Sequence, residues 1–154
     1  EYEKAIADYD EAIRLNPENS IAYNNRGNVY YKLEEYEKAI ADYDEALRLN
    51  PENSTAYYNR GLAYSDLGEY EKAIVDYDEA LRRNPQYANA YNNRGVAYYF
   101  MLQDETDDIL KRTYAQSAID DWQMAEQLGY VLNNAVLDAI GELEAILAEP
   151  TPTP

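Results

Sequence analysis

Three asparagines recur at one position of a regular pattern: Asn25, Asn59 and Asn93 each precede the dipeptide Arg-Gly. A side-chain amide both donates and accepts hydrogen bonds, so a row of amides can pair with the backbone of an extended peptide without reading its sequence. Asparagine is at best neutral in a helix, so helix stability gives no local reason for this choice. We interpret these three residues, the asparagine ladder, as a candidate peptide-binding feature. The alternative, that they suit a solvated helix face in an inherited repeat, stays open.

The residues that catalysis and metal binding usually require are absent from the sequence. The chain contains neither His nor Cys, which removes the commonest general base, the commonest metal ligand and any thiol nucleophile. It also has no Gly-rich phosphate loop. The acidic run 104–108 lacks the alternating spacing and the central glycine of a calcium loop. We therefore expect a protein that is not an enzyme and that holds no metal and no cofactor.

The charge balance restricts the partners. The chain has 30 acidic and 13 basic side chains and a net charge of −17. This charge repels phosphate backbones and anionic lipids, so we expect a protein or peptide partner, no nucleic acid and no membrane. No apolar run reaches the roughly 18 residues of a membrane span, and the expected location is the cytoplasm. Most acids form solvated surface, although recognition of a basic partner by the acidic face is an alternative.

A repeat positions the ladder. The string Tyr-Glu-Lys-Ala-Ile begins at Tyr2, Tyr36 and Tyr70, at intervals of 34 residues. Each period holds two stretches with apolar residues at three- and four-residue steps, such as 20–33 and 36–49, which predicts two helices per period. A proline after the second stretch ends that helix, and an Asn or Ser that follows can cap the next one.

Small residues indicate where the helices press together. Gly27, Gly61 and Gly95 lie in the first helices, opposite alanines of the second helices, and tyrosines fill the space around them. The chain has 18 Tyr against one Phe and one Trp, and we expect most of these rings in the core. One helix pair cannot bury its apolar stripe alone, whereas stacked pairs can.

The pattern resembles the tetratricopeptide-repeat (TPR) family, whose signature positions are aromatic, Leu, Gly, Tyr, Ala, aromatic, Ala and Pro. In residues 20–53 they fall on Tyr23, Arg26, Gly27, Tyr30, Ala39, Tyr43, Ala46 and Pro51. In residues 54–87 they fall on Tyr57, Arg60, Gly61, Tyr64, Ala73, Tyr77, Ala80 and Pro85. Only the arginines depart from the pattern. The resemblance implies an all-α, right-handed α-solenoid of antiparallel helix pairs, a TPR superhelix, here with a C-terminal capping helix.

The resemblance also implies a concave groove, lined by the first helix of each repeat, that receives an extended peptide or a partner helix. The candidate groove residues are Asn24, Asn25, Asn28, Tyr31, Tyr58, Asn59, Leu62, Asn92, Asn93, Val96 and Tyr99. We expect this groove to be neutral. A family variant that grips a C-terminal carboxylate needs basic partners, and Lys32 is the only basic residue at a groove position, so this variant is disfavoured.

The three arginines of the Asn-Arg-Gly triplets have two interpretations. Arg26, Arg60 and Arg94 could form an anion-binding stripe. We instead expect their stems to pack between helices and each guanidinium to pair with an acid of the second helix.

The predicted organisation is one TPR domain over 1–149, followed by a Pro-Thr tail at 150–154. The domain comprises the second helix of a truncated repeat (1–19), repeats at 20–53 and 54–87, a repeat at 88–130 and a capping helix (131–149). We expect the apolar stripe of the capping helix to cover the open end of the stack, through Val136, Leu137, Ile140, Leu143 and Leu147. The third repeat holds an insertion of about 11 residues near 102–113, which lengthens both helices or forms an acidic corner. The expected function is a peptide-binding scaffold. The alternative is self-association through the tail or through the uncapped N-terminal end, which we expect to be covered by another chain unless the fragment comes from a longer array.

Overall fold

The computed structural model describes residues 1–150, and all the regular secondary structure there is helical. The helices are α1 (Tyr2–Leu15), α2 (Ser20–Lys32), α3 (Tyr36–Leu49), α4 (Ser54–Asp66), α5 (Tyr70–Arg83), α6 (Ala88–Asp104), α7 (Asp108–Gln127) and α8 (Asn134–Ala148). The chain divides into two compact units, an N-terminal unit with α1 to α5 and a C-terminal unit with α6 to α8. The single domain predicted over 1–149 stays a prediction.

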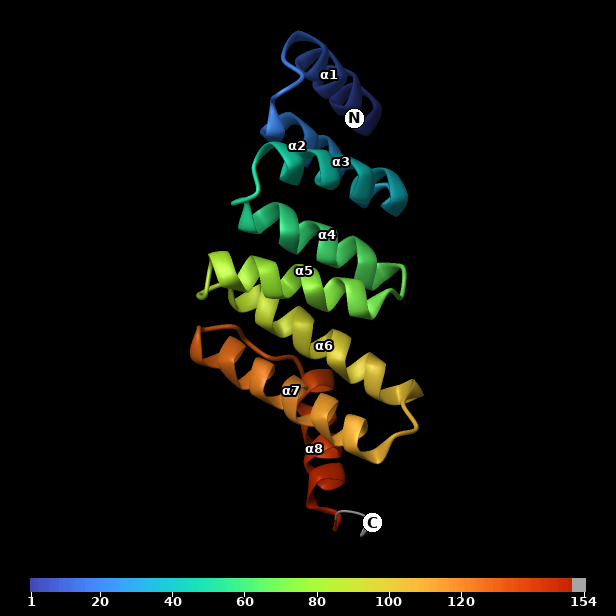
Figure 1. The fold of residues 1–154 in the computed structure, drawn as a ribbon, viewed down its shortest axis with the longest axis vertical. Helices are drawn as coiled ribbons and strands as arrows, with labels where there is room; N and C mark the ends of the chain where they lie inside the picture. The colour runs from blue at the N-terminus through green and yellow to red at the C-terminus, as the bar shows by residue number, and fades with distance from the viewer. Residues whose placement is uncertain (151–154) are drawn as a thin grey trace. The chain divides into compact units, whose positions relative to one another are not determined.

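The N-terminal unit is built from helix hairpins. Helix α2 packs against α3 and α4 packs against α5, each pair joined by a short turn, as Figure 1 shows. Contacts between α3 and α4 join the two hairpins, and α1 packs against α2. This is the arrangement that the two-helix period predicts.

Local chemistry sets the helix boundaries. The side chain of Asn53 accepts hydrogen bonds from the backbone N–H groups of Thr55 and Ala56, both at 3.1 Å, and so caps α4. Asn19 caps α2 in the same way through Ala22 at 3.1 Å. These bonds satisfy amides that the first helical turn leaves without partners, which confirms the capping role predicted from the repeat.

A close approach of helices explains the glycines. A Cβ atom on Gly61 would lie 2.7 Å from Cε1 of Tyr77, a ring that is fully buried. Gly27 stands in the same relation to the buried Tyr43, at 2.8 Å. Only glycine lets the backbone of the first helix reach the ring of the second. The core position predicted for tyrosines is confirmed for these two, whereas the other tyrosines are half-buried or, in the case of Tyr2, exposed.

The arginines of the triplets pair with acids. Arg60 donates to both carboxylate oxygens of Asp76 on α5, at 2.7 and 2.6 Å, and Asp76 is only 2% exposed. Its third contact, at 2.5 Å, is with Asp44 on α3 of the preceding repeat. Arg26 repeats this geometry, and in the C-terminal unit Arg94 donates twice to Asp121. The predicted pairing is confirmed, and we call this arrangement the arginine clamp.

In the C-terminal unit, the inserted residues lie mainly in the helices. Helix α6 has 17 residues and α7 has 20, whereas α2 and α3 have 13 and 14. The link between them, residues 105–107, is as short as the links of the earlier hairpins. Asp107 of the acidic run caps α7 by accepting from the N–H groups of Ile109 and Leu110, at 2.8 and 3.0 Å.

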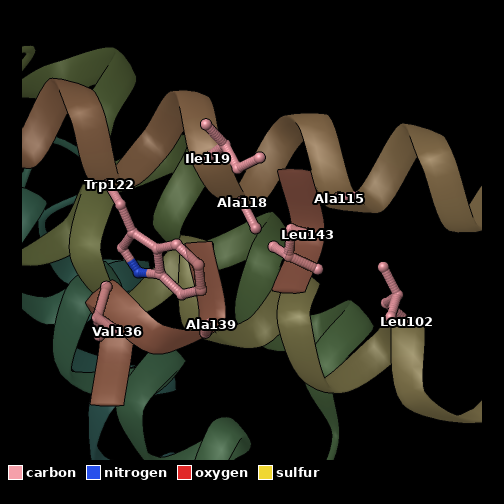
Figure 2. Close-up of a cluster of buried hydrophobic side chains, with 8 residues drawn as sticks. All are labelled: Leu102, Ala115, Ala118, Ile119, Trp122, Val136, Ala139 and Leu143. Atoms are coloured by element: carbon pink, nitrogen blue, oxygen red, sulfur yellow. The ribbon is translucent and has the colours of Figure 1, made fainter. Parts of the chain in front are cut away.

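Helix α8 covers the apolar side of α7. Figure 2 shows side chains of α6, α7 and α8 that form one buried cluster with Trp122, in which α8 supplies Val136, Ala139 and Leu143. We expected Leu137 to take part in this cover, but 49% of it is exposed. It follows Val136 by one residue, about 100° around the helix, and so leaves the apolar stripe.

Candidate peptide-binding face

The candidate groove residues lie on the first helices, α2, α4 and α6, and most are half-buried. Asn24 and Asn92 are the exceptions, with 8% and 7% of each residue exposed. Both are held beside a ladder asparagine: Asn92 donates to Oδ1 of Asn93 at 3.0 Å, and Asn24 approaches Oδ1 of Asn25 at 3.5 Å. They contribute to this face through the side chains they position.

In the N-terminal unit, amides join neighbouring repeats. Nδ2 of Asn59 on α4 donates to Oδ1 of Asn28 on α2 at 2.9 Å and lies 3.5 Å from Oδ1 of Asn24. The phenol of Tyr43 on α3 also donates to Oδ1 of Asn28, at 2.8 Å. The amide of Asn28 is therefore fixed by two donors from two other helices.

The same network leaves some groups unused. Asn28 uses its oxygen twice, and within residues 1–150 its Nδ2 has no hydrogen-bond partner. Asn25 likewise accepts through its oxygen and keeps its Nδ2, while Asn59 donates and keeps its Oδ1. All three side chains are half-buried rather than covered. The face, called here the amide face, thus presents amide donors from α2 and an acceptor from α4.

The central repeat adds an apolar contact to the amide face. Leu62 stands one repeat after Asn28 and is half-buried. Tyr58 lies nearby on α4, with its ring centroid 6.0 Å from that of the buried Tyr77. These side chains offer apolar area that a bound segment could cover without ordering flexible groups.

One carboxylate also lies at the edge of the amide face. The phenol of Tyr31 on α2 donates to Oδ2 of Asp66, the last residue of α4, at 2.5 Å. Burial, and then the hydrogen bond to Asp66, raise the pKa of Tyr31. The phenol therefore stays a proton donor over the physiological range.

The C-terminal unit carries the corresponding residues on α6. Val96 and Tyr99 pack against the cluster around Trp122, so part of each belongs to the core. The phenol of Tyr99 donates to Oε2 of Glu142 on α8 at 3.1 Å. Trp122 donates to the backbone oxygen of Asn92 at 3.1 Å, which anchors α6 at this point.

Two features differ from the sequence-based expectation of a neutral groove. Asp66 and Glu142 place carboxylates beside tyrosines that the sequence did select, Tyr31 and Tyr99. Glu142 was missed because α8 lies outside the repeat, so no periodicity assigns its side chains to a face. Asp66 had a signal, since it stands at a groove position where the preceding repeat has Lys32.

Comparison with known families agrees with this geometry. Family models described as "TPR repeat" match residues 1–34 and 27–68, and one described as "Tetratricopeptide repeat" matches residues 54–87. Together they span 1–87 of the 154 residues, more than half of the chain. The chain is a member of the tetratricopeptide-repeat family. No curated protein matches it in sequence.

Solved structures, two TPR domains among them, resemble this TPR protein over most of its length. The Arabidopsis OM64 TPR domain is 27% identical with a TM-score of 0.69, over 82% of this chain and 94% of that chain. The first TPR of Spaghetti (RPAP3), bound to the HSP90 peptide SRMEEVD, is 24% identical with a TM-score of 0.70, over 84% and 94%. A crystal structure of MamA protein is 25% identical with a TM-score of 0.67, over 86% and 70%. The predicted all-α helical-repeat solenoid is confirmed.

Proposed function

We propose that this TPR protein is an interaction scaffold that holds an extended peptide or partner segment against its first helices, and that it acts by binding rather than by catalysis. The observation that carries the proposal is the amide face. Asn25, Asn28 and Asn59 are half-buried, and each takes part in a hydrogen bond: Asn28 accepts from Asn59 and Tyr43, and Asn25 accepts from Asn24. Each of the three still has an unused amide N–H or carbonyl group.

An extended backbone matches these groups. It offers carbonyl oxygens to the Nδ2 donors of Asn25 and Asn28, and an N–H group to Oδ1 of Asn59. Because Asn28 is already held by Tyr43 and Asn59, little side-chain entropy is lost on binding. Leu62 adds an apolar contact, so we expect binding to combine backbone hydrogen bonds with a small number of apolar anchors.

TPR structures with bound peptides are consistent with this role. The first TPR of Spaghetti is bound to an HSP90 peptide, and the second TPR domain of human RPAP3 is in complex with an HSP70 peptide. Each is 24% identical to this chain, a level at which likeness supports a shared fold. The choice of ligand here is therefore argued from this chain's own amides.

The test is a screen of an extended-peptide library against the intact chain, repeated with Asn59→Ala. Losing the hydrogen bonds of one amide should weaken the selected peptides roughly three- to tenfold. Asn134→Ala is the control, because Asn134 is an exposed residue of α8 and is not one of the candidate groove residues. Circular dichroism establishes that both variants keep their helices. Equal affinity of wild type and Asn59→Ala for every selected peptide would refute a site on the amide face.

Self-association is a second candidate, favoured by the packing of α1. Ala5 and Tyr9 are half-buried, whereas Ala39 and Tyr43, one repeat later, are 0% and 1% exposed. No residue of α1 is buried. Sedimentation over a wide concentration range tests this candidate: association that Tyr9→Glu abolishes would support it, and a monomer throughout would contradict it.

A further inference from the structure

Each compact unit contains a tyrosine that donates a hydrogen bond to a carboxylate. Tyr31 and Tyr99 stand two repeat periods apart, at the same position of their repeats. The phenol of Tyr31 donates to Oδ2 of Asp66 on α4 at 2.5 Å, and the phenol of Tyr99 donates to Oε2 of Glu142 on α8 at 3.1 Å. Both carboxylate residues are exposed. The helix that supplies the acid is a repeat helix, α4, in one unit and the capping helix, α8, in the other.

Neither carboxylate has a cationic partner within residues 1–150. The ion pairs there involve other acids, among them Asp42 and Asp76 in the arginine clamps, and none includes Asp66 or Glu142. The phenols orient the two carboxylates but do not neutralise them. Each acid therefore has one oxygen, Oδ1 or Oε1, left for a further partner.

Helix stability does not account for Asp66. It is the last residue of α4, where the carbonyl end of the helix dipole disfavours an anion. The preceding repeat has Lys32, the favourable charge, as the last residue of α2. An acid at this place weakens the helix, and within residues 1–150 the hydrogen bond from Tyr31 is the contact that holds it.

A second aromatic ring lies beside each of the two hydrogen-bonded tyrosines. The ring centroids of Tyr31 and Tyr36 are 5.5 Å apart, and Tyr36 lies near enough to feel the charge of Asp66, which contributes to the raised pKa of its phenol after burial. In the other unit, the ring of Tyr99 is 5.9 Å from that of Phe100. A cation is attracted both by a carboxylate and by the face of an aromatic ring. The two groups together favour Lys or Arg over a neutral side chain.

We propose that Asp66 anchors a Lys or Arg side chain of the segment held on the amide face, so that the partner of the amide face is a basic extended peptide, and that Glu142 is the same kind of anchor for a basic segment on the C-terminal unit. This inference rests on the proposed function, since the amide face holds the backbone of the segment that Asp66 anchors. It assigns the high negative charge of the chain a role in recognition: the field attracts a basic segment, and an oriented carboxylate in each unit fixes it.

The experiment compares three labelled peptides of about twelve residues that share one Ala-Gly-Ser backbone and carry Arg, Gln or Glu at the same positions. Their affinities for the full chain are measured by fluorescence anisotropy. Each anchor should favour the Arg peptide over the Gln peptide roughly three- to tenfold, from an exposed ion pair and a cation–aromatic contact. The Glu peptide should bind more weakly than the Gln peptide.

Matched variants locate the effect. Asp66→Asn and Glu142→Gln should each lower the affinity for the Arg peptide roughly three- to tenfold and leave the Gln peptide unchanged. The controls Glu37→Gln on α3 and Glu144→Gln on α8 remove the same charge from exposed positions, and should lower the affinity for the Arg peptide less than twofold.

The outcomes separate the two proposals. Equal affinity for the Arg and Gln peptides, with both sensitive to Asn59→Ala, overturns the cation anchors and leaves the peptide-binding role intact. Equal losses in the anchor variants and their controls also overturn the anchors, because binding then responds to net charge alone. If none of the three peptides binds and the library yields no ligand, both proposals fail.

Discussion

Replacing Gly61 by alanine tests the helix approach on which the repeat packing depends. The added Cβ would lie 2.7 Å from Cε1 and 3.0 Å from Cδ1 of Tyr77, and 3.3 Å from the backbone oxygen of Ala73. Carbon atoms in contact prefer about 3.5–4.0 Å, so the ring or the helix must move by about 1 Å. Tyr77 is fully buried, so its ring cannot move without displacing other core side chains.

The magnitude follows from two opposing terms. Overpacking a well-filled core costs about 1–3 kcal/mol, and a locked ring puts Gly61→Ala near the upper end. Alanine gains about 1 kcal/mol over glycine inside a helix. The net expected loss is about 2 kcal/mol of unfolding free energy, or about 4–8 °C in Tm for a chain of this size.

Urea unfolding followed by circular dichroism measures this loss, and Gly141 supplies the control. It lies inside α8, and a methyl group added there would have no neighbour within 4 Å, so Gly141→Ala should stabilise the protein by about 1 kcal/mol through helix propensity alone. The two substitutions are chemically identical and should act in opposite directions. A Gly61→Ala variant as stable as the wild type would refute the claim that glycine is required by the close approach of Tyr77.

Three further predictions concern turns, protonation and the last helix. Gly68 has a φ of 77° and open space around it, so Gly68→Ala should cost about 1 kcal/mol, whereas Glu34→Gly, where φ is 59°, should stabilise by a smaller amount; urea midpoints measure both. Burial raises the pKa of Tyr43 and Tyr77 above the usual value near 10, so above about pH 10 the unfolded state releases protons first. Stability should therefore fall as the pH rises from about 10 to 11, by up to about 1.4 kcal/mol for each buried tyrosine, and a midpoint unchanged over this range would contradict it. Arg112→Gln should expose the end of α8 to hydrogen exchange, because Arg112 donates to the backbone oxygens of Ile146 and Leu147 at 2.8 and 2.6 Å.

The repeat made most of the fold predictable. The 34-residue period, the prolines and the capping asparagines define helix boundaries that depend on local chemistry. The pairing of Arg60 with Asp76 was also within reach, because both residues recur with the period and must meet in every repeat. Because each position has the same neighbours in every repeat, a contact inferred for one copy recurs in the others.

Features outside the period were harder to predict. The sequence left two arrangements open for the inserted residues near 102–113, because their helical pattern does not show where one helix stops. Leu137 was assigned to the core by spacing alone, but the angle at which α8 crosses α7 decides which residues are covered. The contact of Glu142 with Tyr99 depends on the same crossing, which no periodicity specifies.

The arginine clamp makes the stability of one hairpin depend on that of its neighbour. Arg60 binds Asp76 of its own hairpin and Asp44 of the hairpin before it, so one guanidinium links the two hairpins. If either hairpin opens, Arg60 loses one of its two carboxylate partners. Unfolding of one repeat therefore lowers the stability of the next. Gln123 on α7 stands where Asp10 and Asp44 stand on α1 and α3, a neutral amide in place of the acid. Within the N-terminal unit the clamp therefore couples one hairpin to the next. The C-terminal unit has no acid at this place of α7, and α8 is held there by apolar contacts and by the hydrogen bonds of Tyr99 and Arg112.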